Sequence, residues 1–365
     1  MDLHLLGSID AGGPGAFGIQ NRWFALWRQG GLFGKPTLSL HALADMQAIR
    51  TAVYRWKTTP GDSGSAEVKY VAVDPLASRI AVCWSGLVDV VTPMWALNVG
   101  IYDFASDRFI SIPGFATRGA GPAGTLVAAF SPSGRILAAP SSGAEKVYLI
   151  DVDSALDSDR PAQPVVALES GQRLESLGIA WSPDGKLLAH FRDAVPTPKL
   201  DLWRLLNGDD PEYLEAESLG SVPLRGKTPW TSKGAVAFSP DSDLVAVGGL
   251  KKPSVFRMYS VARRELVAES APLEGEVTKL AFSHDGLHVF SGDHKGSVVA
   301  WRRSEGLDRA SLVMVDSASL GRPIIGLDVD RDAQTLCIAS ASKKSVDIHA
   351  AALPGSEARV LTDQE

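Results

Sequence analysis

The stretch KLAFSHDGLHVFSGDHKGSVVAWRR, residues 279–303, decides the fold of this chain. It begins with a short apolar run that ends in Ser-His-Asp-Gly, a tight turn in which glycine tolerates a positive φ. An alternating run follows, then a polar turn around Lys295, and then a run that ends near Trp301. Short apolar runs separated by such turns predict antiparallel β-strands. We name these strands a, b and c, and the more variable segment after them strand d.

Relatives of this pattern recur along the chain. The residue before the a–b turn marks each copy, and neighbouring markers are 44 to 57 residues apart: Val73, Phe130, Trp181, Phe238, Phe282 and Val329. A four-stranded propeller blade takes about 40–45 residues, so the longer spacings predict loop insertions. A seventh unit is expected at the N terminus, because residues 22–43 have the same b-turn-c layout as residues 186–206.

The sequence therefore predicts an all-β protein, a single seven-bladed β-propeller of four-stranded antiparallel blades with a ring closed by a terminal strand. Either residues 3–9 or residues 358–362 could supply that closing strand. The predicted domain covers residues 1–365, with residues 1–9 as one candidate to complete the last blade. Its approximate blades are 10–55, 66–120, 121–170, 171–225, 226–272, 273–318 and 319–365.

The whole chain resembles the WD-repeat β-propeller family, most closely in residues 280–306 and 178–208. In that family a Gly-His pair before strand a, a Ser or Thr on strand b, an Asp in the b–c turn and the strand-c Trp form a buried polar set. Here Glu276 takes the His position and Lys295 the Asp position, while Ser291 and Trp301 remain. We interpret the chain as a divergent member of this family, with a bacterial origin as our preferred hypothesis, and the departures concern the internal polar network rather than the fold.

Charge, cysteine content and hydrophobicity indicate which kinds of partner and compartment to expect. The 36 basic and 42 acidic side chains give a formal charge of −6, which disfavours nucleic acid as a partner. The two cysteines lie far apart, and we interpret them as buried thiols in a reducing compartment. No signal peptide or membrane-length apolar run is present, so we expect a cytoplasmic protein that does not bind membranes.

The inner strands argue against catalysis. They read YVAV, VAAF, GIAW, AVAF, KLAF and GLDV, in which Asp328 is the acidic residue. A metal site needs several converging oxygen or imidazole ligands, and nucleophile or phosphate-binding motifs are missing from the sequence. We therefore expect no enzyme activity and no cofactor. A propeller-type hydrolase or lactonase with a channel metal is the alternative.

The lysines are unevenly distributed. Eight of the 14 fall in b–c turns: Lys35, Lys146, Lys199, Lys251, Lys252, Lys295, Lys343 and Lys344. Propeller geometry places all b–c turns on one face, together with the d–a connections. The a–b turns and c–d connections on the opposite face are acidic, for example in residues 151–159 and 209–217. Turn chemistry and drift could produce such a pattern, but its concentration favours a functional basic face.

The second unit has an apolar b–c connection instead of a lysine. Residues 83–98 carry Trp84, Met94 and Trp95, with Asp89 as the single charge. A long apolar surface loop is either a partner site or a flap that packs on its own blade, and the sequence leaves both open.

We predict a non-catalytic protein-interaction module or scaffold that binds an acidic or phosphorylated segment of a partner, within a multiprotein complex. The predicted partner-binding residues are basic residues and an apolar anchor: Lys251, Lys252, Lys295, Lys343, Lys344 and Lys199, with Trp84, Met94 and Trp95. An RNA-binding scaffold that uses the same lysines is a second alternative, disfavoured by the lack of aromatic residues beside them.

Overall fold

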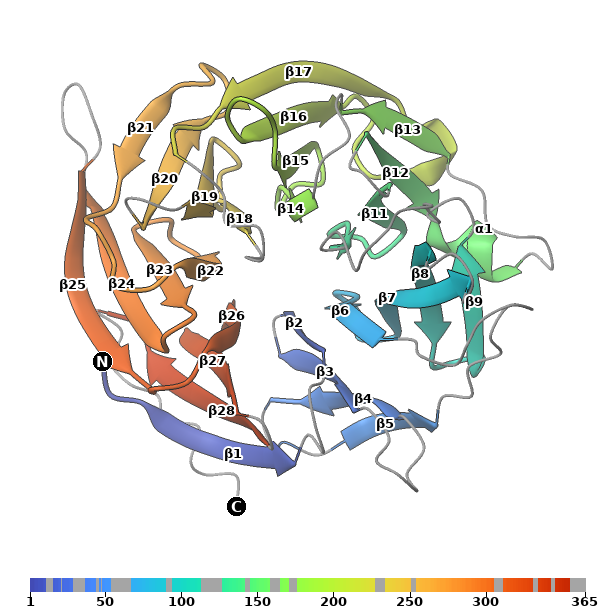
Figure 1. Ribbon diagram of the computed structural model, residues 1–365, viewed down its shortest axis with the longest axis horizontal. Coiled ribbons are helices and arrows are strands. Elements are labelled where there is room, and N and C mark those ends of the chain that lie inside the picture. Colours follow the sequence, from blue (N-terminus) through green and yellow to red (C-terminus); the bar gives the residue numbers. More distant parts are fainter. Residues whose placement is uncertain are drawn as a thin grey trace.

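The computed structural model shows a closed ring of blades around a central axis (Figure 1). It describes residues 1–10, 16–20, 22–28, 37–43, 46, 48–53, 67–89, 94–112, 127–141, 145–157, 165–170, 176–226, 234–250, 254–304, 311–330, 334–342 and 345–354. The described strands form seven four-stranded antiparallel sheets, which confirms the predicted fold.

The first three blades contain strands a to d in chain order. Blade 1 contains β2 (Phe17–Gln20), β3 (Trp23–Arg28), β4 (Thr37–Ala42) and β5 (Ala48–Val53); blade 2 contains β6 (Glu67–Val73), β7 (Arg79–Asp89), β8 (Met94–Asp103) and β9 (Arg108–Ile112). Blade 3 contains β10 (Ala129–Phe130), β11 (Ile136–Pro140), β12 (Lys146–Asp151) and β13 (Val166–Glu169), with α1 (Val152–Asp157) between its last two strands.

The next three blades repeat this order. Blade 4 contains β14 (Ser176–Trp181), β15 (Leu187–Arg192), β16 (Lys199–Leu205) and β17 (Ala216–Pro223), with a 3-10 turn at Pro211–Tyr213. Blade 5 contains β18 (Ala235–Phe238), β19 (Leu244–Leu250), β20 (Val255–Ser260) and β21 (Leu266–Glu269); blade 6 contains β22 (Val277–Phe282), β23 (His288–Asp293), β24 (Ser297–Ser304) and β25 (Ser311–Ser319).

Blade 7 is assembled from both ends of the chain. It contains β26 (Ile324–Asp330), β27 (Thr335–Ala341) and β28 (Ser345–Ala352), and its outer strand is β1 (His4–Asp10), antiparallel to β28. Of the two termini that could close the ring, the N-terminal segment does so. Residues 358–362, the other candidate, lie outside the described residues.

The a–b turns are held by their own side chains. In blade 4, Ser182 Oγ accepts a hydrogen bond from Leu187 N at 2.8 Å and donates one to Asp184 Oδ1 at 2.5 Å. Gly185 adopts a φ of +71°, which a residue with a side chain rarely takes. Ser239 and Ser283 make the same two bonds in blades 5 and 6. The recurrent serine and aspartate in the sequence therefore record this hydrogen-bonded turn.

The marker residues share one place in the register. Phe282 on strand a is opposite Val289 on strand b, which is opposite Trp301 on strand c. Trp203 takes the same strand-c place in blade 4. In blades 1, 3 and 7, however, this place holds His41, Ile150 and Ala351. In blade 3 the aromatic residue of strand c is Tyr148, which lies two residues before this place.

The core lies between neighbouring blades rather than inside each one. One cluster joins Leu149 of blade 3 to Trp181 and Trp203 of blade 4. Another joins Ile9 and Ile348 of blade 7 to Phe24 of blade 1. Each blade therefore buries its apolar faces against two neighbours, and β1 contributes to the packing where the ends of the chain meet.

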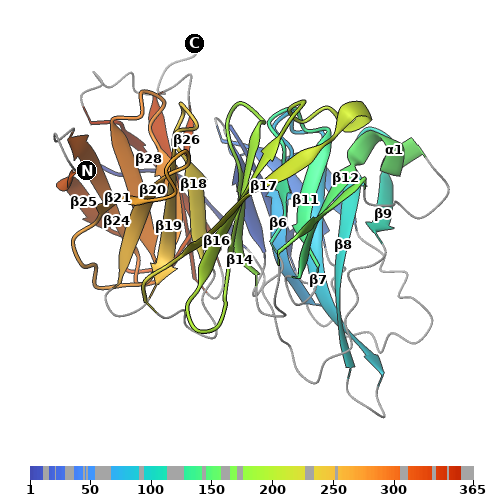
Figure 2. The same cartoon turned by 90° about the horizontal axis from the view of Figure 1, so that it is seen from above.

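The two faces of the ring differ in shape. Figure 2 shows the hairpin of β7 and β8 extending from one face, while α1 lies at the opposite face. The b–c connections therefore share a face with this hairpin, and the a–b and c–d connections share the face with α1. We call these the b–c face and the a–b face.

The role of β1 can be tested by two substitutions on the same strand. Ile9→Ala removes a buried side chain at the junction of blades 7 and 1, and we expect the free energy of unfolding to fall by about 2–4 kcal/mol. Leu5→Ala is the control, because Leu5 is 59% exposed and should change stability little. Urea denaturation measures both, and equal effects would contradict a closing role for β1.

Candidate functional site

Lys295 occupies a rigid turn on the b–c face. Asp293 Oδ1 accepts hydrogen bonds from Lys295 N at 2.9 Å and from Ser297 N at 2.8 Å, which fix the turn between β23 and β24. The Lys295 side chain is exposed. The backbone therefore holds this lysine in place while its ammonium group remains open to solvent.

The other lysines on this face differ in their surroundings. Lys199 is the first residue of β16 and is half-buried. Lys146 begins β12 but forms an ion pair with Glu169 at 2.8 Å, which raises the pKa of the lysine through a hydrogen bond and the opposite charge. Of these lysines, Lys146 is thus already engaged within its own blade. Lys251, Lys252, Lys343 and Lys344, the remaining predicted site lysines, lie outside the described residues, as does Lys35.

The apolar stretch 83–98 is not an irregular loop. Strands β7 and β8 run through it, with Trp84 opposite Asn98 and Leu87 opposite Trp95, and residues 90–93 lie outside the described residues. Strand pairing satisfies the backbone polar groups that an irregular apolar loop would leave to solvent. The connection is therefore a long hairpin, which corrects the expectation of a loop.

The structure also corrects the expectation that Trp84 is an exposed anchor. Its side chain is 6% exposed, and its ring lies 5.6 Å from the ring of Phe109. Burial of an indole within the blade core leaves little of it for a partner. For Met94 and Trp95 the structure describes the backbone at the far end of the projecting hairpin, next to residues 90–93, so their role stays a prediction.

Aspartates on the a–b face serve the turns. Partial burial alone would raise the pKa of Asp184, but hydrogen bonds from Ser182 and Lys186 outweigh it and lower the pKa. The same balance lowers the pKa of Asp285, with bonds from Ser283 and Leu287. These aspartates are therefore explained by the hydrogen bonds of the turns and do not require a binding partner on this face.

A buried polar pair survives in blade 6. Trp301 Nε1 donates to Ser291 Oγ at 2.9 Å, as the resemblance implies. The turn aspartate is present after all, two residues before Lys295, as the buried Asp293. A side chain at Gly275 would place its Cβ 2.4 Å from Asp293 Oδ2, so this carboxylate requires a glycine beside it. Blade 6 thus keeps both the Trp301–Ser291 bond and a turn aspartate, and this aspartate accepts hydrogen bonds from the backbone of the b–c turn.

Blade 4 contains a different buried network, which the sequence alone did not predict. Asp201 Oδ2 accepts from Arg192 Nε at 2.5 Å and from Ser170 Oγ at 2.7 Å, and both charged side chains are 4% exposed. His190 takes the place of Ser291 and lies 2.8 Å from Ser176 Oγ and 3.2 Å from Ser170 Oγ. The sequence does carry a signal for this network. Strand b of blade 4 contains His190, Phe191 and Arg192, where an apolar strand with a serine is expected.

Removing Asp201 should be costly. Asp201→Ala leaves Arg192 buried without its carboxylate, and we expect a loss of about 3–5 kcal/mol in the free energy of unfolding. Glu217→Ala is the control on the neighbouring strand, because the Arg204–Glu217 pair is 2.9 Å long but half exposed. That change should cost less than about 1 kcal/mol in urea denaturation. A similar cost for both variants would show that the buried pair is not critical.

His190 should make stability depend on pH. Burial lowers its pKa from 6.5 to about 4, with Arg192 acting in the same direction and Asp201 against it. The unfolded chain therefore binds a proton that the folded chain rejects, and stability declines as the pH falls from 6.5 toward about 4.

We expect a loss of up to about 3 kcal/mol across this range from His190. Urea midpoints at about pH 7.5 and about pH 5 measure it, and His190→Gln, which keeps a hydrogen-bonding group but does not titrate, should show a smaller drop. An equal drop in both proteins would assign the effect to other histidines.

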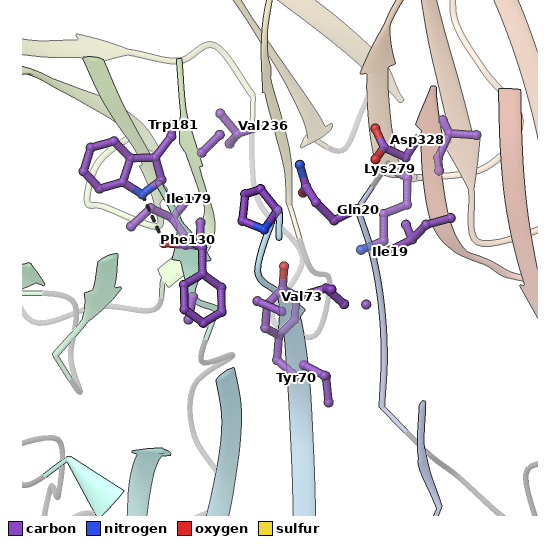
Figure 3. A pocket seen from close by; sticks show the side chains of 18 of the residues that line it. Ile19, Gln20, Tyr70, Val73, Phe130, Ile179, Trp181, Val236, Lys279 and Asp328 are labelled. Atoms are coloured by element: carbon purple, nitrogen blue, oxygen red, sulfur yellow. Dashed lines mark hydrogen bonds between the residues drawn. The ribbon is translucent and has the colours of Figure 1, made fainter. Parts of the chain in front are cut away.

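The central channel contains a cavity of about 360 Å³. Inner strands of all seven blades line it, with Pro75, Pro132 and Pro183 at its a–b end. In Figure 3, Phe130, Ile179, Trp181 and Val236 lie on one side, and Gln20, Lys279 and Asp328 lie on the other. Among the lining residues described, Lys279 and Asp328 carry the charges. Asp328 is identifiable in the sequence as the acidic residue of the inner strands, and Tyr70 and Lys279 stand in the same strands, in YVAV and KLAF.

Lys279 reaches across this channel. Its Nζ lies 6.0 Å from the centre of the Tyr70 ring, although β22 and β6 belong to blades 6 and 2, which are not neighbours. Burial raises the pKa of Tyr70 to about 12, with a smaller contribution from Cys83, so its hydroxyl stays protonated at neutral pH. The channel wall thus presents an ammonium, a carboxylate and a phenol hydroxyl.

Within the described part of the chain, no three His, Cys, Asp or Glu side chains come close enough together to hold a metal ion. The helices in that part are too short to cross a membrane.

Comparisons with known proteins place one segment in a family. Residues 268–302, which include β22 and β23 and end on β24, match the family model described as WD domain, G-beta repeat. No curated protein sequence matches the chain significantly. A chain of the "Crystal Structure of Mitotic Checkpoint Complex" superposes with a TM-score of 0.65 at 16% identity, covering 96% of this chain and 92% of that chain. At this identity the likeness shows the fold alone.

Proposed function

We propose that this chain, which is a WD40-repeat β-propeller, acts as a non-catalytic scaffold whose b–c face holds an acidic or phosphorylated segment of a partner protein. WD40 propellers are typically protein-interaction scaffolds and are generally non-catalytic. The solved chain with the same fold comes from a complex, which supports the proposal that this one also works with protein partners.

The proposal rests on the position and the ion pairing of two lysines, Lys295 and Lys199. Both are on the b–c face, and neither forms an ion pair with any residue that the structure describes. The ammonium of Lys146, by contrast, is held by Glu169. Lysines that do not stabilise their own blade are available to attract an opposite charge. The hydrogen bonds of Asp293 hold the Lys295 backbone, so binding need not reorganise the turn.

The distribution of charge between the faces supports this orientation. Aspartates of the a–b face are committed to turn hydrogen bonds, whereas basic residues dominate the b–c turns in the sequence. A local basic surface can steer an acidic segment even on a chain of net charge −6. We place the complex in the cytoplasm, where buried Cys83 and Cys337 would remain the thiols that the structure shows.

The test compares two double variants with equal charge. Lys199→Glu with Lys295→Glu reverses two charges on the b–c face, and Lys186→Glu with Arg263→Glu reverses two exposed charges on the a–b face. Each double changes the formal charge from −6 to −10. We expect the first to lose at least about tenfold in affinity for a purified partner or a phosphorylated acidic peptide, and the second to bind like the wild type. The loss should grow when Lys251, Lys252, Lys343 and Lys344 are also reversed.

Three outcomes distinguish the alternatives. Equal binding by both doubles would overturn the basic-face proposal. In that case β25 is the next surface to examine, because Val313, Met314 and Val315 are exposed on this outer strand. Tighter binding to single-stranded RNA than to the acidic peptide, with a steep dependence on salt, would favour the RNA-binding alternative.

A further inference from the structure

One corner of the b–c face brings together two connections of blade 4. The loop between β15 and β16 ends at Lys199, which lies opposite Pro223, the last residue of β17. Leu224 N donates a hydrogen bond to Pro198 O at 2.8 Å, so the chain that leaves β17 is tied to this loop. The next residue, Arg225, is therefore close to Lys199, although the two are distant in the sequence.

The backbone of Arg225 is fixed, whereas its side chain is exposed. Arg257 of blade 5 donates a hydrogen bond from Nη1 to Arg225 O, and the same guanidinium pairs with Glu269. Arg225, like Lys199, forms no ion pair with any residue that the structure describes. Burial raises the pKa of Tyr259 to about 12, so this nearby phenol is neutral and does not offset the charge of Arg225. Two cations therefore share this corner.

An exposed apolar tip borders the two cations. Val195 is 70% exposed, and Pro196 beside it is also exposed. Their loop extends from the same face as the hairpin of β7 and β8 (Figure 2). The carboxylate of this loop, on Asp193, accepts a hydrogen bond from Ala194 N at 3.0 Å and has a further partner, so it is engaged within the protein. The loop begins after Arg192, whose guanidinium is in the buried ion pair of blade 4.

From this arrangement we infer that the corner formed by Val195, Pro196, Lys199 and Arg225 binds a phosphorylated residue of the partner protein together with an adjacent apolar side chain. The phosphate oxygens pair with Lys199 and Arg225, and the apolar side chain packs on Val195 and Pro196. The inference rests on the proposed function and specifies which acidic group the b–c face recognises and where.

Two physical arguments select this chemistry. A phosphomonoester carries a charge of about −1.5 to −2 at neutral pH, so one group can compensate both cations, whereas a carboxylate carries a single charge. The planar guanidinium of Arg225 can bind two phosphate oxygens at once, and the ammonium of Lys199 adds a point charge. Because the backbone at both residues is already held by hydrogen bonds, binding has to order little more than their side chains.

The experiment measures fluorescence polarisation of labelled, glutamate-rich peptides with the full chain. Each peptide contains one phosphoserine and one leucine, and the set moves the leucine through every position on either side of the phosphoserine. We expect the best peptide to bind at least about tenfold more tightly than the same peptide with serine or glutamate in place of phosphoserine. Replacing its leucine by alanine should weaken binding at least about threefold.

Variants then locate the site. Arg225→Gln and Lys199→Gln should each weaken binding at least about fivefold and reduce the preference for phosphoserine, whereas Arg263→Gln, at an exposed arginine on the a–b face, should bind like the wild type. Val195→Ser should weaken binding of the leucine peptide but not of the alanine peptide. Leu206→Ser is its control, because Leu206 is 53% exposed on the a–b face.

The outcomes separate this inference from the proposed function. Unchanged binding by Arg225→Gln and Val195→Ser, with a loss when Lys199 and Lys295 are both reversed, would overturn the inference and leave the proposed function standing. Equal affinity for the phosphoserine and serine peptides, or no binding of any peptide up to about 1 mM, would also overturn it. Tighter binding of single-stranded RNA than of the best peptide would assign the corner to nucleic acid instead.

Discussion

The antiparallel pairing of β1 with β28 joins both ends of the chain in one sheet, and the packing of the ring depends on it. A single blade has two apolar faces and cannot bury either alone, so its stability comes from its neighbours. Ile9 on β1 packs with Phe24 of blade 1, which brings the first and last blades into the same core cluster. Without this strand, β28 would expose an edge, and one of the inter-blade cores would lose part of its contents.

Local hydrogen bonding explains why the repeat can be recognised at all. The serine and aspartate of the a–b turn bond to each other and to the turn backbone, so selection for a tight turn leaves a readable trace at Ser182, Ser239 and Ser283. The marker residue before each turn follows from the same register. The sequence therefore predicts the number of blades, the a–b turns and the all-β class, because each depends on residues close together in the chain.

Features that depend on contacts between distant residues were not predictable in the same way. An apolar connection at residues 83–98 reads as a loop, yet strand pairing continues through most of it and buries Trp84. Lysines look alike in sequence, but Glu169 engages Lys146 from the next strand. The choice of β1 over the other end of the chain as the closing strand depends on packing across the ring. The hairpin pairs residues within the stretch itself, but Phe109, Glu169 and β28, which pack on Trp84, engage Lys146 and pair with β1, lie outside the patterns of the sequence.

The buried polar networks show how much freedom the fold leaves. A polar group removed from water must be satisfied, but the fold does not prescribe which residues satisfy it. Blade 6 does so with the bond from Trp301 to Ser291, and blade 4 with an ion pair and a neutral histidine. The family pattern is weak in this chain because several local solutions fill the same place between strands b and c.

The inner strands tolerate fewer kinds of side chain than the outer strands do, so the charged residues of the channel are notable. Seven strands converge on the axis, so most of their positions are held to small or apolar side chains. The long Lys279 side chain spans the channel toward Tyr70, and Asp328 lies on the adjacent strand. Charges cost free energy in such an enclosed space unless something compensates them, and Lys279 and Asp328 both have interaction partners. The inner strands therefore accept a charged side chain where neighbouring residues compensate it, whereas the turns on either face place their charges in water.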